Sequence, residues 1–128
     1  MSIRKNFKPT ESELEILQIL WNHGSCTVRD VHEEISKTKE TGYTTTLKLM
    51  QIMSEKGLVI RDERSKTHIY QPAISRQKTQ KQFLDKMIDG LFSGSSSQLV
   101  IQALGNQKTS KVEIEEIQKY LDNLKAGK

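Results

Sequence analysis

Cysteine is nearly absent from this sequence, and long apolar runs are missing. Cys26 is the only cysteine among 128 residues, so no intrachain disulfide can form, as is usual in a reducing compartment. No stretch approaches the roughly 18 apolar residues of a membrane-spanning helix. The basic start of the chain is not followed by the apolar segment of a secretory signal. We therefore expect a soluble, cytoplasmic protein that does not insert into a membrane.

The residue patterns of catalytic and metal sites are missing as well. No serine occupies a G-x-S-x-G turn, and no glycine-rich loop could cradle a phosphate. The ligand spacing of a metal site is not found among His23, Cys26, His32 and His68. We expect no enzymatic activity, no metal and no cofactor.

Apolar residues make up only 34% of the chain, and the mean hydropathy is −0.61. The hydrophobic core must therefore be thin, and a chain of this kind often gains stability by pairing with a second copy. The formal net charge is +4, an excess too weak to indicate nucleic acid by itself. Whether the chain is suited to nucleic acid therefore depends on where the charges lie in the sequence.

Three helices are predicted in the first half of the chain. The first begins at a capping box of Thr10 and Glu13, and the second has Thr27 as its N-cap. The third is expected over about 44–56, with Gly57 after its last turn. Its buried stripe, spaced three and four residues apart, consists of Thr46, Leu49, Met50 and Met53.

A β-hairpin is predicted next. Residues 58–60 and 69–70 have β character, the polar segment 61–67 lies between them, and Pro72 closes the second strand. Three helices followed by a hairpin is the order of a winged helix-turn-helix. The fold class is thus mainly α with a small β-hairpin, and we assign 1–73 to a DNA-binding domain.

Residues 74–128 are predicted to form a helical dimerisation domain. A long helix follows Ser75, a short one spans about 97–104, a loop covers 105–109, and a capping box of Ser110 and Glu113 opens the last helix. An alternative is that this region folds back on the winged helix within one chain. The apolar positions expected to form the dimer interface are Leu84, Met87, Ile88, Leu91, Leu99, Ile114, Ile117, Leu121 and Leu124.

The third helix carries the side chains that suit DNA reading. A helix in the major groove needs short polar residues near its N-terminus, as Thr44 and Thr45 are, and Gln51 can bond adenine with both amide atoms. An ordinary amphipathic surface helix would show the same spacing. The predicted DNA-binding residues are Thr27, Tyr43, Thr44, Thr45, Lys48, Gln51, Arg61, Arg64 and Lys66.

The hairpin and the second helix would add contacts to the DNA backbone. Wing cations and the hydroxyl of Thr27 can bind phosphates, which adds affinity but little specificity. Asp62 and Glu63 dilute the wing's charge, so a solvated loop is an alternative, and Thr27 can act as a cap alone. Arg4, Lys5 and Lys8 would belong to a basic arm or a disordered start. A winged-helix module that binds proteins instead of DNA is the alternative function.

Three motifs in order resemble the penicillinase-repressor family of bacterial regulators. They are residues 11–17 with Trp21, residues 42–46 through 55–59 followed by 70–72, and residues 91–95 followed by Leu99 and Val100. The resemblance covers nearly the whole chain. It implies a homodimeric repressor on a pseudo-palindromic operator, with interlocked C-terminal helices. Its implied partners are double-stranded operator DNA, a second copy, and a membrane sensor-protease system whose action leads to cleavage in the C-terminal domain.

The chain differs from the family's pattern in three places. Gln102-Ala103 stands where classic members have the cleaved Asn-Phe bond, so the resemblance does not predict cleavage or β-lactam control here. The C-terminal cysteines of the copper-responsive branch are missing, which excludes copper sensing by thiolates. Ile52 replaces an arginine that is frequent in the family, so one contact of the third helix with DNA is not expected.

Overall fold

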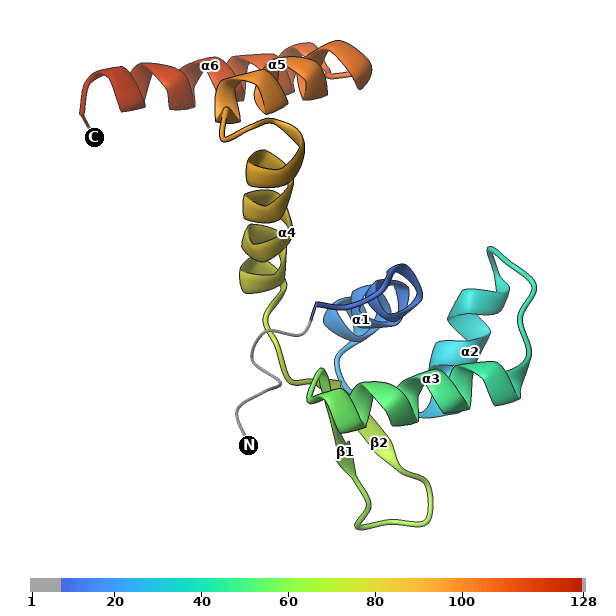
Figure 1. Ribbon diagram of the computed structural model, residues 1–128. Coiled ribbons are helices and arrows are strands. Elements are labelled where there is room, and N and C mark those ends of the chain that lie inside the picture. The colour runs from blue at the N-terminus through green and yellow to red at the C-terminus, as the bar shows by residue number, and fades with distance from the viewer. Residues whose placement is uncertain (1–7, 128) are drawn as a thin grey trace. The chain divides into compact units, whose positions relative to one another are not determined.

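The computed structural model describes residues 8–127; of the suggested basic arm, Arg4 and Lys5 lie outside the described residues and Lys8 is the first of them. The elements are α1 (Glu11–His23), α2 (Val28–Ser36), α3 (Tyr43–Lys56), β1 (Val59–Asp62), β2 (Ile69–Pro72), α4 (Arg76–Leu91), α5 (Ser96–Asn106) and α6 (Lys111–Lys125) (Figure 1). The predicted fold class, mainly α with one hairpin in winged helix-turn-helix order, is confirmed. The chain divides after Lys81 into an N-terminal and a C-terminal compact unit.

Capping boxes begin α1 and α2 as predicted. The Thr10 hydroxyl accepts from the Glu13 N–H at 3.2 Å, and the Glu13 carboxylate accepts from the Thr10 N–H at 2.9 Å. Thr27 and Asp30 make the same reciprocal pair at 3.1 and 3.0 Å. Each box satisfies two of the backbone donors that a helix start leaves free, so these boundaries are fixed by local chemistry.

The core of the N-terminal unit lies among the first three helices and the hairpin. The predicted stripe of α3 is confirmed at Thr46, Met50 and Met53, whereas Leu49 is half-buried. The apolar members of the core are Ile16, Leu17, Leu20, Cys26, Val28, Val31, Ile35, Met50, Met53, Leu58, Val59 and Tyr70.

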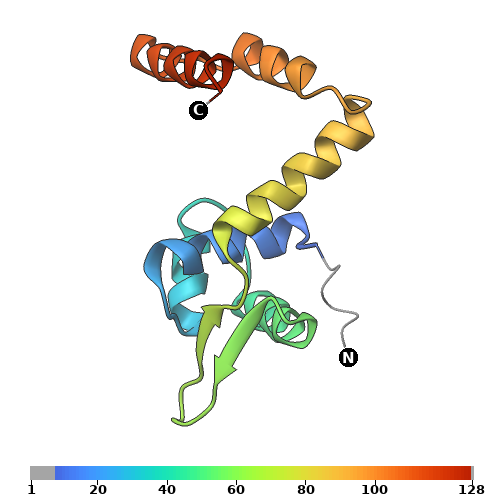
Figure 2. The ribbon, with the colours of Figure 1, turned by 90° about the vertical axis from the view of Figure 1, so that its left-hand side faces the viewer.

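The two strands pair antiparallel in a register from Val59 opposite Pro72 to Asp62 opposite Ile69. The predicted loop began at residue 61, which was wrong, because Arg61 pairs with Tyr70 inside the ladder. At the other side of β2, Cys26 and Tyr70 exchange backbone hydrogen bonds of 2.9 and 2.8 Å. This bridge fixes the base of the hairpin to the residue just before the cap of α2. Figures 1 and 2 show the hairpin, the wing, extending away from the three helices.

The chain returns from the wing to α1 before it enters α4. The indole Nε1 of Trp21 donates to the carbonyl oxygen of Ile74 at 3.0 Å, and the Arg76 guanidinium lies 5.6 Å from the centre of the Trp21 ring. Thr79, in the first turns of α4, is buried and donates to the Ser75 carbonyl. These contacts place the start of α4 in the N-terminal unit.

In the C-terminal unit, α5 and α6 are two separate helices joined by a short turn (Figure 2). The predicted loop from residue 105 was wrong at its start, because α5 continues through Asn106 and the N–H of Gln107 still donates to Ala103 at 3.1 Å. The capping box of Ser110 and Glu113 is confirmed. Between residues 8 and 127, the structure contains no helix with both the length and the apolar character to cross a bilayer.

Candidate nucleic-acid interface

The outward face of α3 is polar and open to solvent. Thr44, Thr45, Lys48 and Gln51 are all exposed, on a helix whose other side is anchored by buried Met50 and Met53. Hydroxyl, ammonium and amide groups are donors and acceptors that match base edges and phosphate oxygens. The helix therefore presents a reading surface with a rigid support behind it.

A groove of about 320 Å³ lies between the start of α2, the face of α3 and the wing. It brings together five of the nine predicted DNA-binding residues with Leu47 of α3 and with Thr67 and His68 of the wing, two residues that the sequence did not single out as DNA contacts. Only the packing of the hairpin beside α3 brings Thr67 and His68 to the others. The lining residues are Thr27, Val28, Tyr43, Leu47, Gln51, Arg61, Lys66, Thr67, His68 and Tyr70.

The remaining predicted residues, Thr44, Thr45, Lys48 and Arg64, do not line the groove. The two threonines and Lys48 extend the same surface along α3. Arg64 lies at the turn of the wing, with 90% of its side chain exposed. The nine residues thus form one groove, one helix face beside it and one wing tip.

Tyr43, at the start of α3, is 47% exposed and is positioned from behind by α2. The His32 ring meets the Tyr43 ring edge-on, with 5.6 Å between centroids at an interplanar angle of 79°. The two His32 nitrogens lie 3.4 Å from the hydroxyls of Thr46 and Ser36. His32 therefore supports the tyrosine, a role that the sequence analysis did not foresee.

Of the two roles that the sequence left open for Thr27, the capping role is confirmed, and the phosphate-binding role stays a prediction. The Thr27 hydroxyl oxygen accepts from the Asp30 N–H, which makes the capping role certain, and the hydroxyl proton can still be donated. The positive end of the α2 dipole faces the groove at this point. The Asp30 carboxylate, which accepts from the Thr27 N–H, opposes an anion at this position.

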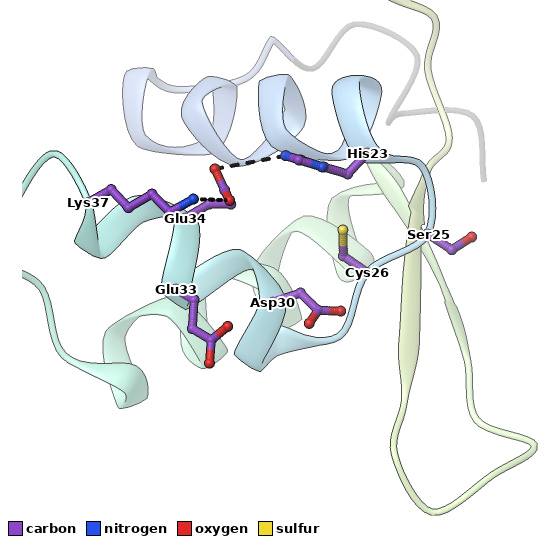
Figure 3. A pocket seen from close by; sticks show the side chains of 7 residues that line it. All are labelled: His23, Ser25, Cys26, Asp30, Glu33, Glu34 and Lys37. Atoms are coloured by element: carbon purple, nitrogen blue, oxygen red, sulfur yellow. Dashed lines mark hydrogen bonds and ion pairs between the residues drawn. The ribbon is translucent and has the colours of Figure 1, made fainter.

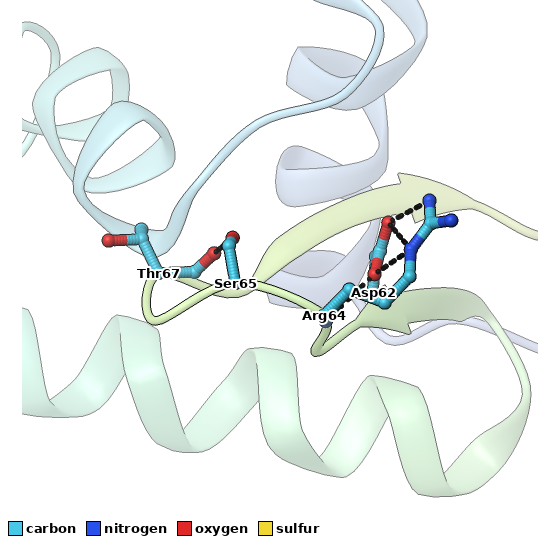
Figure 4. Close-up of polar contacts among 4 residues, drawn as sticks. All are labelled: Asp62, Arg64, Ser65 and Thr67. Carbon is cyan, nitrogen blue, oxygen red and sulfur yellow. Dashed lines mark hydrogen bonds and ion pairs between the residues drawn. The ribbon is translucent and has the colours of Figure 1, made fainter.

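Both arginines of the wing are engaged by carboxylates of the wing. Arg64 donates to Asp62 from Nη2 at 2.8 Å and from Nε at 3.1 Å (Figure 4). These bonds and that from the Arg64 backbone N–H lower the pKa of Asp62 to about 2. Arg61 pairs with Glu63 and hydrogen-bonds the Tyr70 side chain, and both contacts raise the pKa of Arg61. Lys66 has no ion pair within residues 8–127 and is the wing's most available cation.

A second hollow, of about 310 Å³, lies on the N-terminal unit, and three of its seven lining residues, Asp30, Glu33 and Glu34, are acidic (Figure 3). Glu34 there contacts Lys37 at 2.8 Å and His23 at 3.8 Å, and the hydrogen bond from Lys37 lowers the pKa of Glu34. Burial, with Asp30 next in effect, raises the pKa of the Cys26 thiol. The described residues hold no group of three ligands suited to a metal ion. Its acidic lining makes this hollow unsuited to DNA.

The predicted dimerisation residues are exposed or half-buried within the single chain. No residue from 82 to 127 is buried, and Leu91 exposes 77% of its surface. Five others, each 43–54% exposed, are Leu84, Met87, Ile114, Leu121 and Leu124. Ile88, Leu99 and Ile117 are half-buried. The C-terminal unit therefore lacks a closed core of its own.

The family model of the penicillinase repressor matches residues 9–123. The chain belongs to the penicillinase repressor family. This confirms the resemblance drawn from the sequence motifs. In this family member, Gln102 and Ala103 are exposed but lie within α5, so a protease would need local unfolding of that helix to reach the bond between them.

Two relatives of similar length are penicillinase repressors. The penicillinase repressor of Bacillus licheniformis is 24% identical over 119 residues, covering 93% of each chain. That of Staphylococcus aureus is 26% identical over 124 residues, covering 94% of this chain and 95% of its own. Among solved structures, the monomeric form of Bacillus licheniformis BlaI in complex with the blaP half-operator matches with a TM-score of 0.49 at 24% identity, over 56% of this chain and 87% of that chain.

Proposed function

We propose that this chain is a transcriptional repressor that binds a pseudo-palindromic operator as a homodimer. The observation that carries the proposal is the exposed polar face of α3 beside the cationic groove, in a chain of the penicillinase repressor family. Two full-length relatives are themselves named penicillinase repressors. The chain would act in the cytoplasm by occupying DNA and not by catalysis.

In this proposal α3 enters the major groove and the wing follows the backbone. Thr44, Thr45 and Gln51 read base edges, since base edges in this groove carry the sequence code. Lys48 reaches a guanine or a phosphate. Tyr43 and Thr27 lie at the groove where a phosphate would pass.

The dimer would be built by the C-terminal region. Its apolar faces are exposed in one chain, and an isologous two-fold interface would cover the same faces on both copies. Two recognition helices related by this symmetry require half-sites about one turn of DNA apart. We propose residues 1–73 as the DNA-binding part and 74–128 as the pairing part.

The test is a titration of the full chain against its own promoter fragment and against a scrambled duplex of equal composition. We expect the promoter fragment to bind at much lower protein concentration, and its affinity to fall steeply with salt because phosphate contacts release counterions. Equal binding of both duplexes would contradict operator recognition. No binding of either would leave the protein-interaction module as the better account.

A further inference from the structure

Two carboxylates of the wing bind the arginines that could bind DNA phosphates. Arg64 donates from both Nε and Nη2 to Asp62, and its backbone N–H donates to the same carboxylate at 3.0 Å. Arg61 is paired with Glu63. A carboxylate presents two acceptor oxygens to a guanidinium in the same fork geometry as a phosphate does. Each arginine that could bind the backbone therefore already has an anionic partner.

The Asp62 carboxylate is the anion that Arg64 holds most firmly in its charged form. The Arg64 contacts hold the pKa of Asp62 at about 2, so its carboxylate stays charged near neutral pH. Three cations and two carboxylates between residues 61 and 67 leave the wing with a net charge of +1 (3 − 2). Most of the wing's positive charge is thus neutralised within the wing.

DNA phosphates could replace these carboxylates as partners of the arginines, but the carboxylates would stay in the wing, close to the DNA. An exposed ion pair contributes little stability, so a phosphate can take over an arginine at small cost. The displaced carboxylate then stays beside a row of phosphates, whose charge repels it. The repulsion weakens the contact between the wing and the DNA backbone, which carries no sequence information. It leaves the contacts between α3 and the bases untouched.

We propose that Asp62 and Glu63 are affinity-limiting residues that compete with backbone phosphates for Arg64 and Arg61. They keep the sequence-independent part of DNA binding weak, so that binding depends more on what α3 reads. This inference rests on the proposed function, because it assumes that the wing meets DNA.

The sharpest variant is Asp62→Asn. Its side-chain oxygen can still accept from the Arg64 N–H, so the turn is kept while the charge is lost. We expect about three- to tenfold tighter binding to the scrambled duplex at low salt, and a salt slope steeper by about 0.9, the value for one added phosphate contact. Glu11→Gln removes one charge from an exposed position in the first turn of α1 and serves as the matched control, with little change expected.

A double-mutant cycle separates competition for Arg64 from a general change of charge. In an Arg64→Gln background the Asp62→Asn effect should be clearly smaller, because Asp62 no longer competes for Arg64 and only the repulsion between its carboxylate and the phosphates is left to remove. An equal gain with and without Arg64, or a gain no larger than that of Glu11→Gln, would overturn the inference. If the wild-type chain binds no duplex, both the proposed function and this inference fail. If the wild-type chain binds DNA and Asp62→Asn has no effect, only this inference fails.

Discussion

The Glu13 carboxylate links the start of α1 to the end of α3. It accepts from the Thr10 N–H at 2.9 Å and from the Lys56 ammonium at 2.8 and 3.0 Å, and only 3% of its side chain is exposed. A buried charge is tolerated only when it is paired and hydrogen-bonded. One residue thus combines a local cap with a tertiary ion pair, which makes its removal costly.

Glu13→Ala should lower the free energy of unfolding by about 2 kcal/mol, since it removes the cap acceptor and leaves Lys56 partly buried without this partner. Urea unfolding followed by the fluorescence of Trp21, the only tryptophan, measures the loss. Glu15→Gln, which breaks an exposed pair with Lys39, should leave the transition nearly unchanged. Similar effects of the two variants would show that the buried pair has no special weight.

At the reading face, Gln51→Ala should relax base preference at one operator position without a large loss of affinity for scrambled DNA. The reason is that an amide can contact a base with two bonds, whereas a phosphate contact carries no sequence information. Binding to a set of duplexes with single base changes measures it. Gln18→Ala, at an exposed position of α1, is the matched control, and equal profiles for both variants would reject the role of Gln51.

Lys66→Ala should weaken binding to all sequences alike and reduce the salt slope by about 0.9, the value for one lost phosphate contact. Titrations of operator and scrambled duplexes at several salt concentrations measure both quantities. Lys119→Ala, at an exposed position of α6, removes the same charge far along the sequence. A loss confined to the operator would show that Lys66 reads bases instead.

Among the elements, α3 is the one whose ends set the position of both the polar helix face and the wing. It begins after Gly42 without a side-chain cap and ends at Gly57, whose φ of 84° and ψ of 15° are left-handed. The Gly57 N–H closes the helix on Ser54 at 3.1 Å, and the Leu58 N–H reaches Met53 at 2.9 Å. This C-terminal stop turns the chain directly into β1, so it sets where the wing starts.

Gly57→Ala should cost about 1 kcal/mol of unfolding free energy, because a Cβ is strained in the left-handed region. Gly57→Asn should cost less, since asparagine tolerates this conformation better. Thermal or urea unfolding at one fixed protein concentration compares the two. Equal stability of the alanine variant and the wild type would mean that the turn relaxes into another conformation.

For the whole molecule, the question is what covers the apolar surface of the C-terminal unit. Residues 82–127 include no buried side chain, although a helix in water needs packing of its apolar face for most of its stability. The apolar residues of α6 in the predicted interface, Ile114, Ile117, Leu121 and Leu124, are spaced three and four residues apart, as in helices that pair. We call this row the α6 seam. A second copy would supply the missing half of this core.

Leu121→Asp should convert dimers to monomers and weaken operator binding, because a charge is costly at the centre of an apolar interface. Sedimentation measures the assembly state, and a titration with operator DNA measures the affinity. Val112→Asp lies nine residues away, about two and a half turns, on the opposite side of α6, and is 64% exposed; it should remain dimeric. A stable dimer of the Leu121 variant would contradict the prediction that this row of α6 residues forms the dimer interface.

The sequence by itself determined the elements and the buried face of α3. Capping boxes at Thr10, Thr27 and Ser110 are local interactions within four residues, and helical periodicity follows from the spacing of apolar side chains. The two boundaries that failed have different causes. Arg61 belongs to β1 because it pairs with Tyr70 across the hairpin, which its polar neighbours do not reveal, and Gly105 lies inside α5 because a helix tolerates a single glycine at a modest cost.

Only the tertiary structure decided how the candidate site is assembled. Thr67 and His68 reach the groove because the hairpin packs beside α3, and the backbone bridge between Cys26 and Tyr70 fixes the wing's base. The engagement of Arg64 by Asp62 likewise depends on a turn geometry that charge counting cannot supply. Local chemistry specifies helices within a few residues, whereas a surface built from three elements exists only after long-range packing has brought them together.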